Sequence, residues 1–109
     1  HLDLIKLFKF LPKKDIRLIA KEALDAIKKA NLVVEINTAG YRKPIKEQYP
    51  SNDLLEELAV RDIPITFSSD AHKPEQVGMG GKKATALAKK YGYTKCAIFS
   101  KRDRSLIEF

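Results

Sequence analysis

The chain has one cysteine, two histidines and no long apolar run. Its single cysteine, Cys96, cannot form an internal disulfide bond, which fits a location in the reducing cytoplasm. Cys96 lies in the apolar stretch KCAIF, so we expect a small buried core residue and not a reactive thiol. No apolar stretch approaches the length of a membrane-spanning helix, and we therefore expect no membrane partner.

Several common catalytic and ligand-binding sequence motifs are also absent. The Cys/His spacing of a structural zinc finger is absent. The segment GMGGKKAT lacks the four-residue gap of a phosphate-binding P-loop, and it is better explained as a backbone hinge before a helix. Neither histidine has a nucleophile in a strained elbow, which excludes a visible Ser-His-Asp triad. The tyrosines form no aromatic–basic pattern of the kind that stacks nucleic-acid bases.

The charge is strongly positive, with 21 lysines and arginines against 14 acidic residues and a formal net charge of +7. Such a balance attracts anions, including nucleic acid and phosphorylated metabolites. The lysines are scattered over the outer faces of the expected helices, however, which a solvated surface explains equally well. A non-catalytic basic binding module therefore stays an alternative, and nucleic acid is not the favoured partner.

The length of 109 residues fits one domain with one core. Apolar residues recur at helical spacing in three segments, 11–32, 53–62 and 82–93. Short β-branched or apolar runs, typical of strands, occupy four others, 32–37, 63–69, 95–100 and 104–109. This alternation predicts an α/β fold in which parallel strands alternate with helices through right-handed crossovers.

Three local details belong to this prediction. Residues 1–6 should be the end of a strand that runs into a loop. Asp15 should cap the first helix at its N-terminal end. Asp53 and Glu56 should form a capping box at the start of the second helix.

Polar clusters follow three of the expected strands, in residues 1–6, 35–43 and 68–72. In parallel α/β folds ligands collect at the carboxyl ends of the strands, so these clusters should converge. Asp70 and His72 are two positions apart and would point the same way in an extended segment. Carboxylate oxygen and imidazole nitrogen suit Zn, Mn or Fe(II), although a short D-x-H pattern also fits an aspartate that fixes a histidine tautomer. His1 is the only other histidine and stands in another of the clusters.

Four further residues have both a functional and a structural interpretation. Glu35 lies in an apolar strand, where a carboxylate must be paired, and Asn37 ends that strand. Arg42 could capture a phosphate with its planar guanidinium or could be an ordinary loop arginine. Lys6 likewise could bind a phosphate or could be an ordinary loop residue.

Together, HLDLIK, EINTAGYRKPIKEQYPS and TFSSDAHKPEQVG, in this order, resemble the C-terminal third of histidinol-phosphate phosphatases of the PHP (polymerase and histidinol phosphatase) superfamily. The resemblance implies a distorted (β/α)7 TIM-like barrel with up to three metal ions at its C-terminal face. It implies hydrolysis of L-histidinol phosphate to L-histidinol and phosphate, a step of histidine biosynthesis. The alternative is that the protein is another phosphoesterase, or an exonuclease, of the same superfamily and acts on a different substrate.

The resemblance also assigns residues. His1, Asp70 and His72 match metal ligands, and Arg42 matches a residue that holds the substrate phosphate. Glu35 and Asn37 match a motif near the site. The family's early H-x-H motif and its middle His and Glu ligands are absent from this sequence. We therefore expect residues 1–109 to be the C-terminal part of one PHP domain, inactive or weakly active alone, which self-associates or combines with an N-terminal part.

Overall fold

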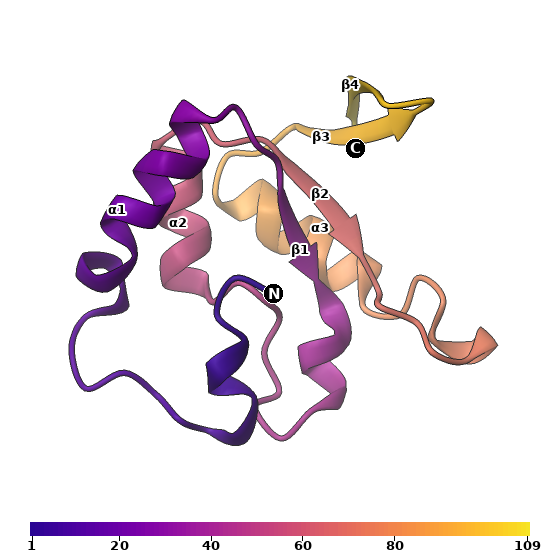
Figure 1. Ribbon diagram of the computed structural model, residues 1–109. Coiled ribbons are helices and arrows are strands. Elements are labelled where there is room, and N and C mark those ends of the chain that lie inside the picture. Colours follow the sequence, from indigo (N-terminus) through magenta and orange to yellow (C-terminus); the bar gives the residue numbers. More distant parts are fainter.

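A computed structural model describes all residues, 1–109, as a mixed α/β fold (Figure 1). Its α-helices are α1 (Ile16–Lys29), α2 (Asn52–Val60) and α3 (Gly81–Lys90). Its strands are β1 (Val34–Asn37), β2 (Ile65–Ser68), β3 (Lys95–Ser100) and β4 (Asp103–Glu108). Three short 3-10 segments, η1 (Leu4–Phe8), η2 (Thr38–Arg42) and η3 (Pro74–Gln76), lie between them. All three predicted helices and all four predicted strands from residue 11 onward are confirmed.

The segment at the N-terminal end differs from its prediction. Residues 1–6 are not the end of a strand, because Leu4–Phe8 forms a 3-10 turn. The backbone N–H of Lys6 donates to Asp3 O at 3.2 Å, and that of Lys9 donates to Lys6 O at 2.8 Å. The Lys6 ammonium also pairs with the Asp3 carboxylate at 3.0 Å, which favours this close turn over an extended strand.

The strands form two separate pairs. β1 and β2 are parallel, with Val34 beside Ile65 and Asn37 beside Ser68, and α2 provides the crossover between them. β3 and β4 are antiparallel and form a hairpin, which extends away from the helices in Figure 1. The predicted parallel arrangement is therefore confirmed for β1 and β2 alone. Lys101 and Arg102 adopt φ values of 48° and 73°, the left-handed turn that pairs β3 with its immediate neighbour in sequence.

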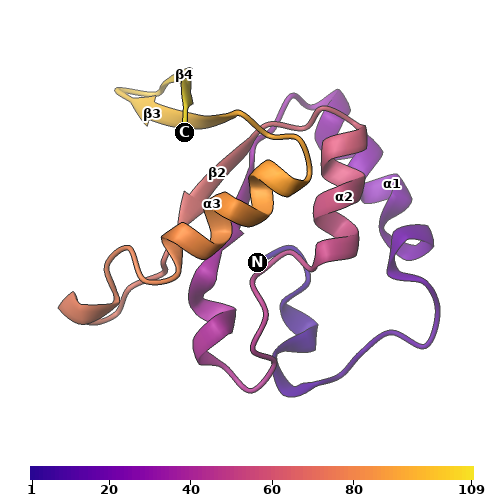
Figure 2. The same ribbon diagram turned by 180° about the vertical axis from the view of Figure 1, so that it is seen from behind.

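The helices bury the core against the β1–β2 pair. α1 and α2 lie side by side, and α3 lies behind the strands in Figure 1 and in front of them in Figure 2. The helix α3 thus covers one face of the strand pair, with the fully buried Ala84 and Ala88 allowing a close approach. Seven fully buried aliphatic side chains of the core come from α1, β1, α2, β2 and the segment before β2: Leu24, Ile36, Leu54, Leu55, Leu58, Ile63 and Ile65.

The predicted burial of Cys96 is confirmed, and burial raises the pKa of its thiol. The predicted cap of α1 is also confirmed, since the Asp15 carboxylate accepts a hydrogen bond of 2.9 Å from the Arg17 backbone N–H. The prediction of a capping box at the start of α2 is wrong, because no side chain caps this helix. Asp53 and Glu56 instead face the Arg17 guanidinium, at 2.9 and 3.6 Å, and thereby join α2 to α1.

No helix is both long enough and apolar enough to cross a membrane.

Candidate functional site

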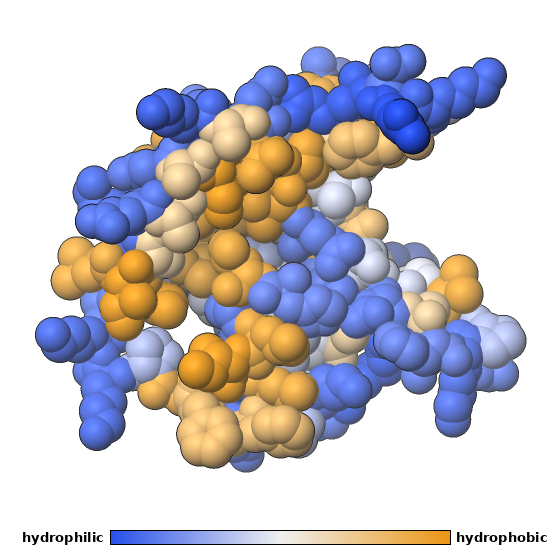
Figure 3. Space-filling view, viewed as in Figure 1, coloured by the Kyte–Doolittle hydropathy of each residue, from blue (hydrophilic) through white to orange (hydrophobic).

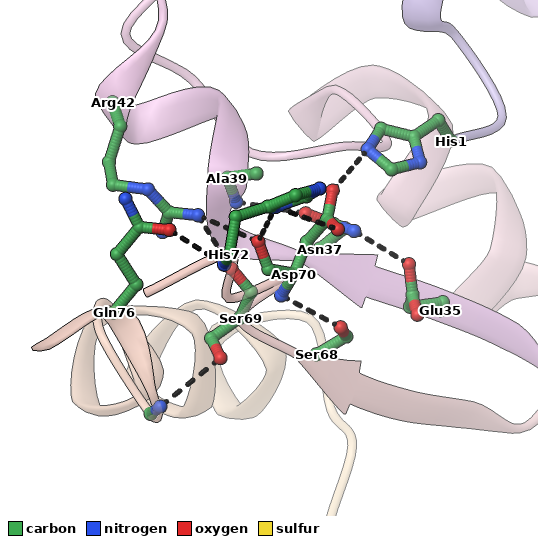
Figure 4. Close-up of polar contacts among 11 residues, drawn as sticks. His1, Glu35, Asn37, Ala39, Arg42, Ser68, Ser69, Asp70, His72 and Gln76 are labelled. Atoms are coloured by element: carbon green, nitrogen blue, oxygen red, sulfur yellow. Dashed lines mark hydrogen bonds and ion pairs between the residues drawn. The ribbon is translucent and has the colours of Figure 1, made fainter. Parts of the chain in front are cut away.

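The site is centred on a contact between His1 and Asp70 (Figure 4). Asp70 stands two positions after the last residue of β2, and His1 precedes η1. The Nε2 atom of His1 lies 3.1 Å from Asp70 Oδ2, and the two side chains are 30% and 32% exposed. The His1 ring also packs against the buried Tyr49 ring, with centroids 5.0 Å apart. The structure thus brings together two of the three side chains predicted to bind a metal.

Asp70 is held in a turn whose shape the local sequence does not reveal. Its φ of 48° lies in the left-handed region, which aspartate tolerates better than most residues. The Asp70 backbone N–H donates to Ser68 Oγ at 3.0 Å, and the Gly78 N–H donates to Ser69 Oγ at 3.1 Å. A serine two positions before an aspartate is a recognisable sequence signal for such a local side-chain-to-backbone bond.

His72 is oriented by the backbone of this turn. Its Nδ1 lies 2.9 Å from the Asp70 carbonyl oxygen, which can only accept a hydrogen bond. Nδ1 therefore carries a proton in this contact, and in the neutral imidazole the lone pair is on Nε2. The Nδ1 atom is 3.8 Å from Asp70 Oδ1, and the His72 side chain is 78% exposed. The D-x-H segment is not extended as predicted, because Asp70 adopts a left-handed φ of 48°.

The donor atoms fit part of a metal site. His1 Nε2 and Asp70 Oδ2 are close enough to contact one cation, and nitrogen with carboxylate oxygen is a donor set that suits Zn, Mn or Fe(II). The chain contains no group of three His, Cys, Asp or Glu side chains arranged to hold a metal ion. The three predicted ligands therefore do not complete a coordination shell in this arrangement.

Glu35 and Asn37 form a small hydrogen-bonded unit beside this contact. The Asn37 side-chain amide donates to Glu35 Oε1 at 2.8 Å, and Asn37 Oδ1 accepts from the Ala39 backbone N–H at 2.8 Å. Asn37 thereby caps η2, the segment that carries Arg42. Glu35 and His1 line the same cavity of about 290 Å³ at the start of β1. The partner expected for this carboxylate in an apolar strand is thus a side-chain amide.

Arg42 reaches the Asp70 turn from the end of η2. One of its terminal nitrogens, Nη2, donates to the carbonyl oxygens of Ser69 at 2.8 Å and Asp70 at 3.1 Å. The Asp70 carbonyl oxygen consequently accepts from both Arg42 and His72. A cavity of about 270 Å³ lies next to the turn and includes Ser68, Ser69 and Thr38 in its lining.

Sequence comparisons find relatives for this chain, although no protein-family model matches it. The chain is 45% identical to a probable histidinol-phosphatase of Deinococcus radiodurans over 78 residues, 72% of this chain and 29% of that protein. This chain is related in sequence to the histidinol-phosphatases. It is also 32% identical to a probable histidinol-phosphatase of Schizosaccharomyces pombe, over 93% of this chain and 35% of that protein. A histidinol-phosphatase of Bacillus subtilis is 35% identical over 68% of this chain and 28% of that protein.

These relatives confirm the resemblance seen in the three sequence motifs. The chain spans about a third of the length of the histidinol-phosphatases that it matches. The rest of those proteins has no counterpart among the residues compared.

Lys6 is the last of the predicted site residues, and it lies in a different environment. Its ammonium pairs with Asp3 at 3.0 Å and Glu47 at 2.7 Å and donates to the Gln48 carbonyl oxygen at 2.7 Å. Only 4% of Lys6 is exposed. It lines the largest cavity, of about 440 Å³, between η1 and the N-terminal ends of α1 and α2, which includes neither His1 nor Asp70. These contacts favour the structural interpretation of Lys6.

Proposed function

We propose that this chain is the C-terminal part of a histidinol-phosphatase of the PHP type. In this proposal His1, Asp70 and His72 are ligands of divalent metal ions, with Zn, Mn or Fe as the expected elements. The observation that carries it is the contact between His1 and Asp70, two side chains distant in sequence, in a chain related to histidinol-phosphatases. The reaction is the hydrolysis of L-histidinol phosphate to L-histidinol and phosphate.

The arrangement of β1, α2, β2 and α3 supports assignment to a (β/α)7 TIM-like barrel. The two strands are parallel with a helical crossover, and α3 packs on one of their faces (Figure 2). In such barrels the helices form an outer layer and the site residues follow the carboxyl ends of the strands. Asp70 follows the end of β2, and Arg42 stands at the end of the η2 segment that follows β1.

The chemistry divides between the ions and the side chains. Divalent ions, when bound, supply Lewis-acid stabilisation for the negative charge of a reacting phosphoryl group. Asp70 would contribute a carboxylate of opposite charge to the ions, and His1 would contribute an imidazole nitrogen beside it. The proton on His72 Nδ1 is held by the Asp70 carbonyl oxygen, which keeps the Nε2 lone pair available as a donor. The net charge of +7 favours the approach of a phosphorylated substrate.

Activity of the isolated chain is expected to be weak or absent. Its His, Cys, Asp and Glu side chains form no three-membered metal-holding group. Large apolar side chains also remain exposed, including Phe8 and Phe10 at 69% each, and apolar surface is visible over the face shown in Figure 3. We propose that self-association or an N-terminal part of the domain covers this surface and completes the site.

Metal binding is the first test. The chain and its Asp70→Ala and His72→Ala variants are equilibrated with Zn²⁺ or Mn²⁺, and bound metal is measured by elemental analysis. We expect both substitutions to reduce the bound metal. Asp62→Ala is the matched control, because Asp62 is another aspartate with a left-handed φ, of 50°, outside the site. Equal metal content in all four proteins would argue against the metal site.

Substrate is tested in a chimera in which this chain replaces the matching segment of the Deinococcus radiodurans relative. We expect the chimera to release phosphate from L-histidinol phosphate and its Asp70→Ala variant to release none. Release of nucleotides from single-stranded DNA, measured in parallel, distinguishes an exonuclease. A folded, metal-binding chimera that attacks only DNA would overturn the proposed substrate.

A further inference from the structure

The outer edge of β4 has no partner strand. β4 pairs with β3 alone, and all six of its residues are exposed. None of the backbone hydrogen bonds formed outside the helices and strands involves residues 103–108. Figures 1 and 2 show the hairpin at the margin of the molecule. An unpaired strand edge is a template for another strand, so this edge is a candidate interaction surface.

β4 lacks two of the features with which proteins block pairing at such edges. Its register with β3 runs without interruption from the Ser100–Asp103 pair to the Lys95–Glu108 pair, so no bulge bends the edge. The strand contains no proline, and Leu106 near its centre is 54% exposed. Charged side chains are the remaining protection, and their arrangement decides which strand can pair.

The turn of the hairpin fixes which residues of β4 present their backbone groups to the free edge. Its two-residue loop makes the flanking pair, Ser100 and Asp103, a hydrogen-bonded one. Hydrogen-bonded and non-hydrogen-bonded pairs alternate along an antiparallel ladder, so every second residue of β4, starting from Asp103, bonds toward β3. The others direct their backbone N–H and C=O groups outward: Arg104, Leu106 and Glu108.

These outward-facing residues are complementary to themselves in the antiparallel direction. With Leu106 opposite Leu106 of a second copy, Arg104 lies opposite Glu108, and Glu108 lies opposite Arg104. The same strand thus supplies both members of the opposite-charge pairs, as a two-fold symmetric interface requires. A shift of two residues is the smallest that keeps the hydrogen bonds, and in either direction it places Leu106 opposite a charged residue.

The contacts within the chain leave both charges available for this pairing. The Glu108 side chain is 84% exposed, and its carboxylate lies 4.0 Å from the Lys95 ammonium on β3. Arg104 uses two N–H groups for Asn31, whose carbonyl and side-chain oxygens each accept at 2.9 Å. A guanidinium has five N–H groups, so others remain for a carboxylate. The Asn31 contact also reduces the conformational freedom that Arg104 would lose on association.

We propose that the free edge of β4 pairs antiparallel with the same edge of a second copy of this chain, with Leu106 on the two-fold axis and Arg104 opposite Glu108. The two hairpins then form one continuous antiparallel sheet. This interface depends neither on the proposed metal ions nor on the proposed substrate.

Disulfide formation in the 109-residue chain tests the register. In a hydrogen-bonded antiparallel pair the Cα atoms lie about 5.5 Å apart, which a disulfide bridges. We expect mild oxidation to link Leu106→Cys chains through the introduced cysteines, as identified by mass spectrometry. Ser105→Cys is the matched control, because it is exposed on the same strand but would lie about 7–8 Å from its copy. The parent chain, whose Cys96 is buried, should stay unlinked.

An exchange of charges tests the complementarity. Arg104→Glu and Glu108→Arg, each made in the Leu106→Cys chain, place like charges opposite each other, and we expect disulfide formation to slow about tenfold. The double variant, Arg104→Glu with Glu108→Arg, restores the opposite-charge pairs and should recover the original rate. Recovery separates the interface from the lost contact between Arg104 and Asn31, which the double variant does not restore.

Three results would overturn the proposal. Equal rates for Leu106→Cys and Ser105→Cys would mean that the chains link by random collision. A double variant as slow as the single ones would mean that Arg104 and Glu108 do not face each other. The third is a chimera with the Deinococcus radiodurans relative, as described above, in which Leu106→Cys stays unlinked, because the rest of the domain then covers the edge of β4.

Discussion

The ammonium group of Lys6 lies 2.7 Å from the Glu47 carboxylate, across 41 positions of the chain. The contact fixes the N-terminal segment that carries His1 against the loop that leads to α2. Asp3 strengthens it from the other side, because its carboxylate meets Lys6 at 3.0 Å and accepts from the Ser51 backbone N–H at 2.8 Å.

Lys6→Met should destabilise the fold substantially, because it leaves the buried Asp3 carboxylate without its counter-charge. Removing one partner of a buried pair costs about 3–5 kcal/mol. We expect the lower end of this range, since the Glu47 side chain is 31% exposed and can be solvated. Urea unfolding measures the change in free energy. Lys21→Met, which breaks the exposed pair with Asp25, is the control and should change little; equal losses in both variants would contradict the prediction.

Gly80→Ala should be the most damaging of three glycine substitutions around the start of α3. Gly80 has φ +80°, and a Cβ there would lie 2.9 Å from both Thr38 Cβ and Tyr41 Cδ2. Gly78→Ala isolates the backbone effect, because Gly78 has φ +70° with no atom near its added Cβ, and should cost about 1–2 kcal/mol. Gly81→Ala has neither problem and should be neutral or stabilising.

Chemical denaturation of the three glycine variants gives this order directly. Equal stability of the Gly78→Ala and Gly80→Ala chains would show that the close approach of η2 to the start of α3 does not constrain the fold.

Alkaline pH should destabilise the chain through Tyr93. Burial raises the pKa of the Tyr93 phenol well above its usual range, and the hydroxyl donates to Ile63 O at 2.9 Å. The unfolded chain loses this proton near pH 10 while the folded chain retains it, so the contribution is intact below about pH 10 and declines as the pH rises further. Denaturation between pH 8 and 11 should show a shallower decline for Tyr93→Phe than for the parent chain. Identical pH profiles would exclude Tyr93 as a source of the decline.

The isolated chain should associate in solution. Exposed apolar side chains occur on η1, α1 and the hairpin, among them Ile5 at 74%, Leu18 at 73% and Phe99 at 58%. Exposed apolar side chains of this size favour self-association. Light scattering at increasing concentration should give a mass above the 12.3 kDa of one chain. A single species of monomer mass throughout the range would contradict the proposal that another surface covers these residues.

Helices and strands were predictable where the apolar spacing is long and regular. The stripe containing Ala20 and Ile27 specifies α1, and the β-branched run ending at Asn37 specifies β1. Residues 1–6 were mispredicted because their apolar residues alternate as in a strand, whereas the buried pairing of Lys6 with Glu47 decides their conformation. That partner is too distant in sequence for a local pattern to reveal.

The candidate site was likewise predictable from the sequence only in part. The residue types of Asp70 and His72, and their place after a strand, were readable from the sequence. The left-handed turn between β2 and η3 was not, because its partners include Arg42 from another segment, which a local pattern does not reveal. The direction of the His72 ring follows from that turn, so the extended geometry assumed for the pair was wrong.

The hairpin of β3 and β4 has a consequence for the order in which the chain folds. Its outermost pair, Lys95 and Glu108, is close in sequence, whereas β1 and β2 are separated by the whole of α2. Hairpins form in about 1–10 μs, and pairings between distant segments are slower because more chain must be ordered first. The C-terminal strands should therefore be in place before the parallel pair that carries Asp70, and the site should be among the last parts of the molecule to form.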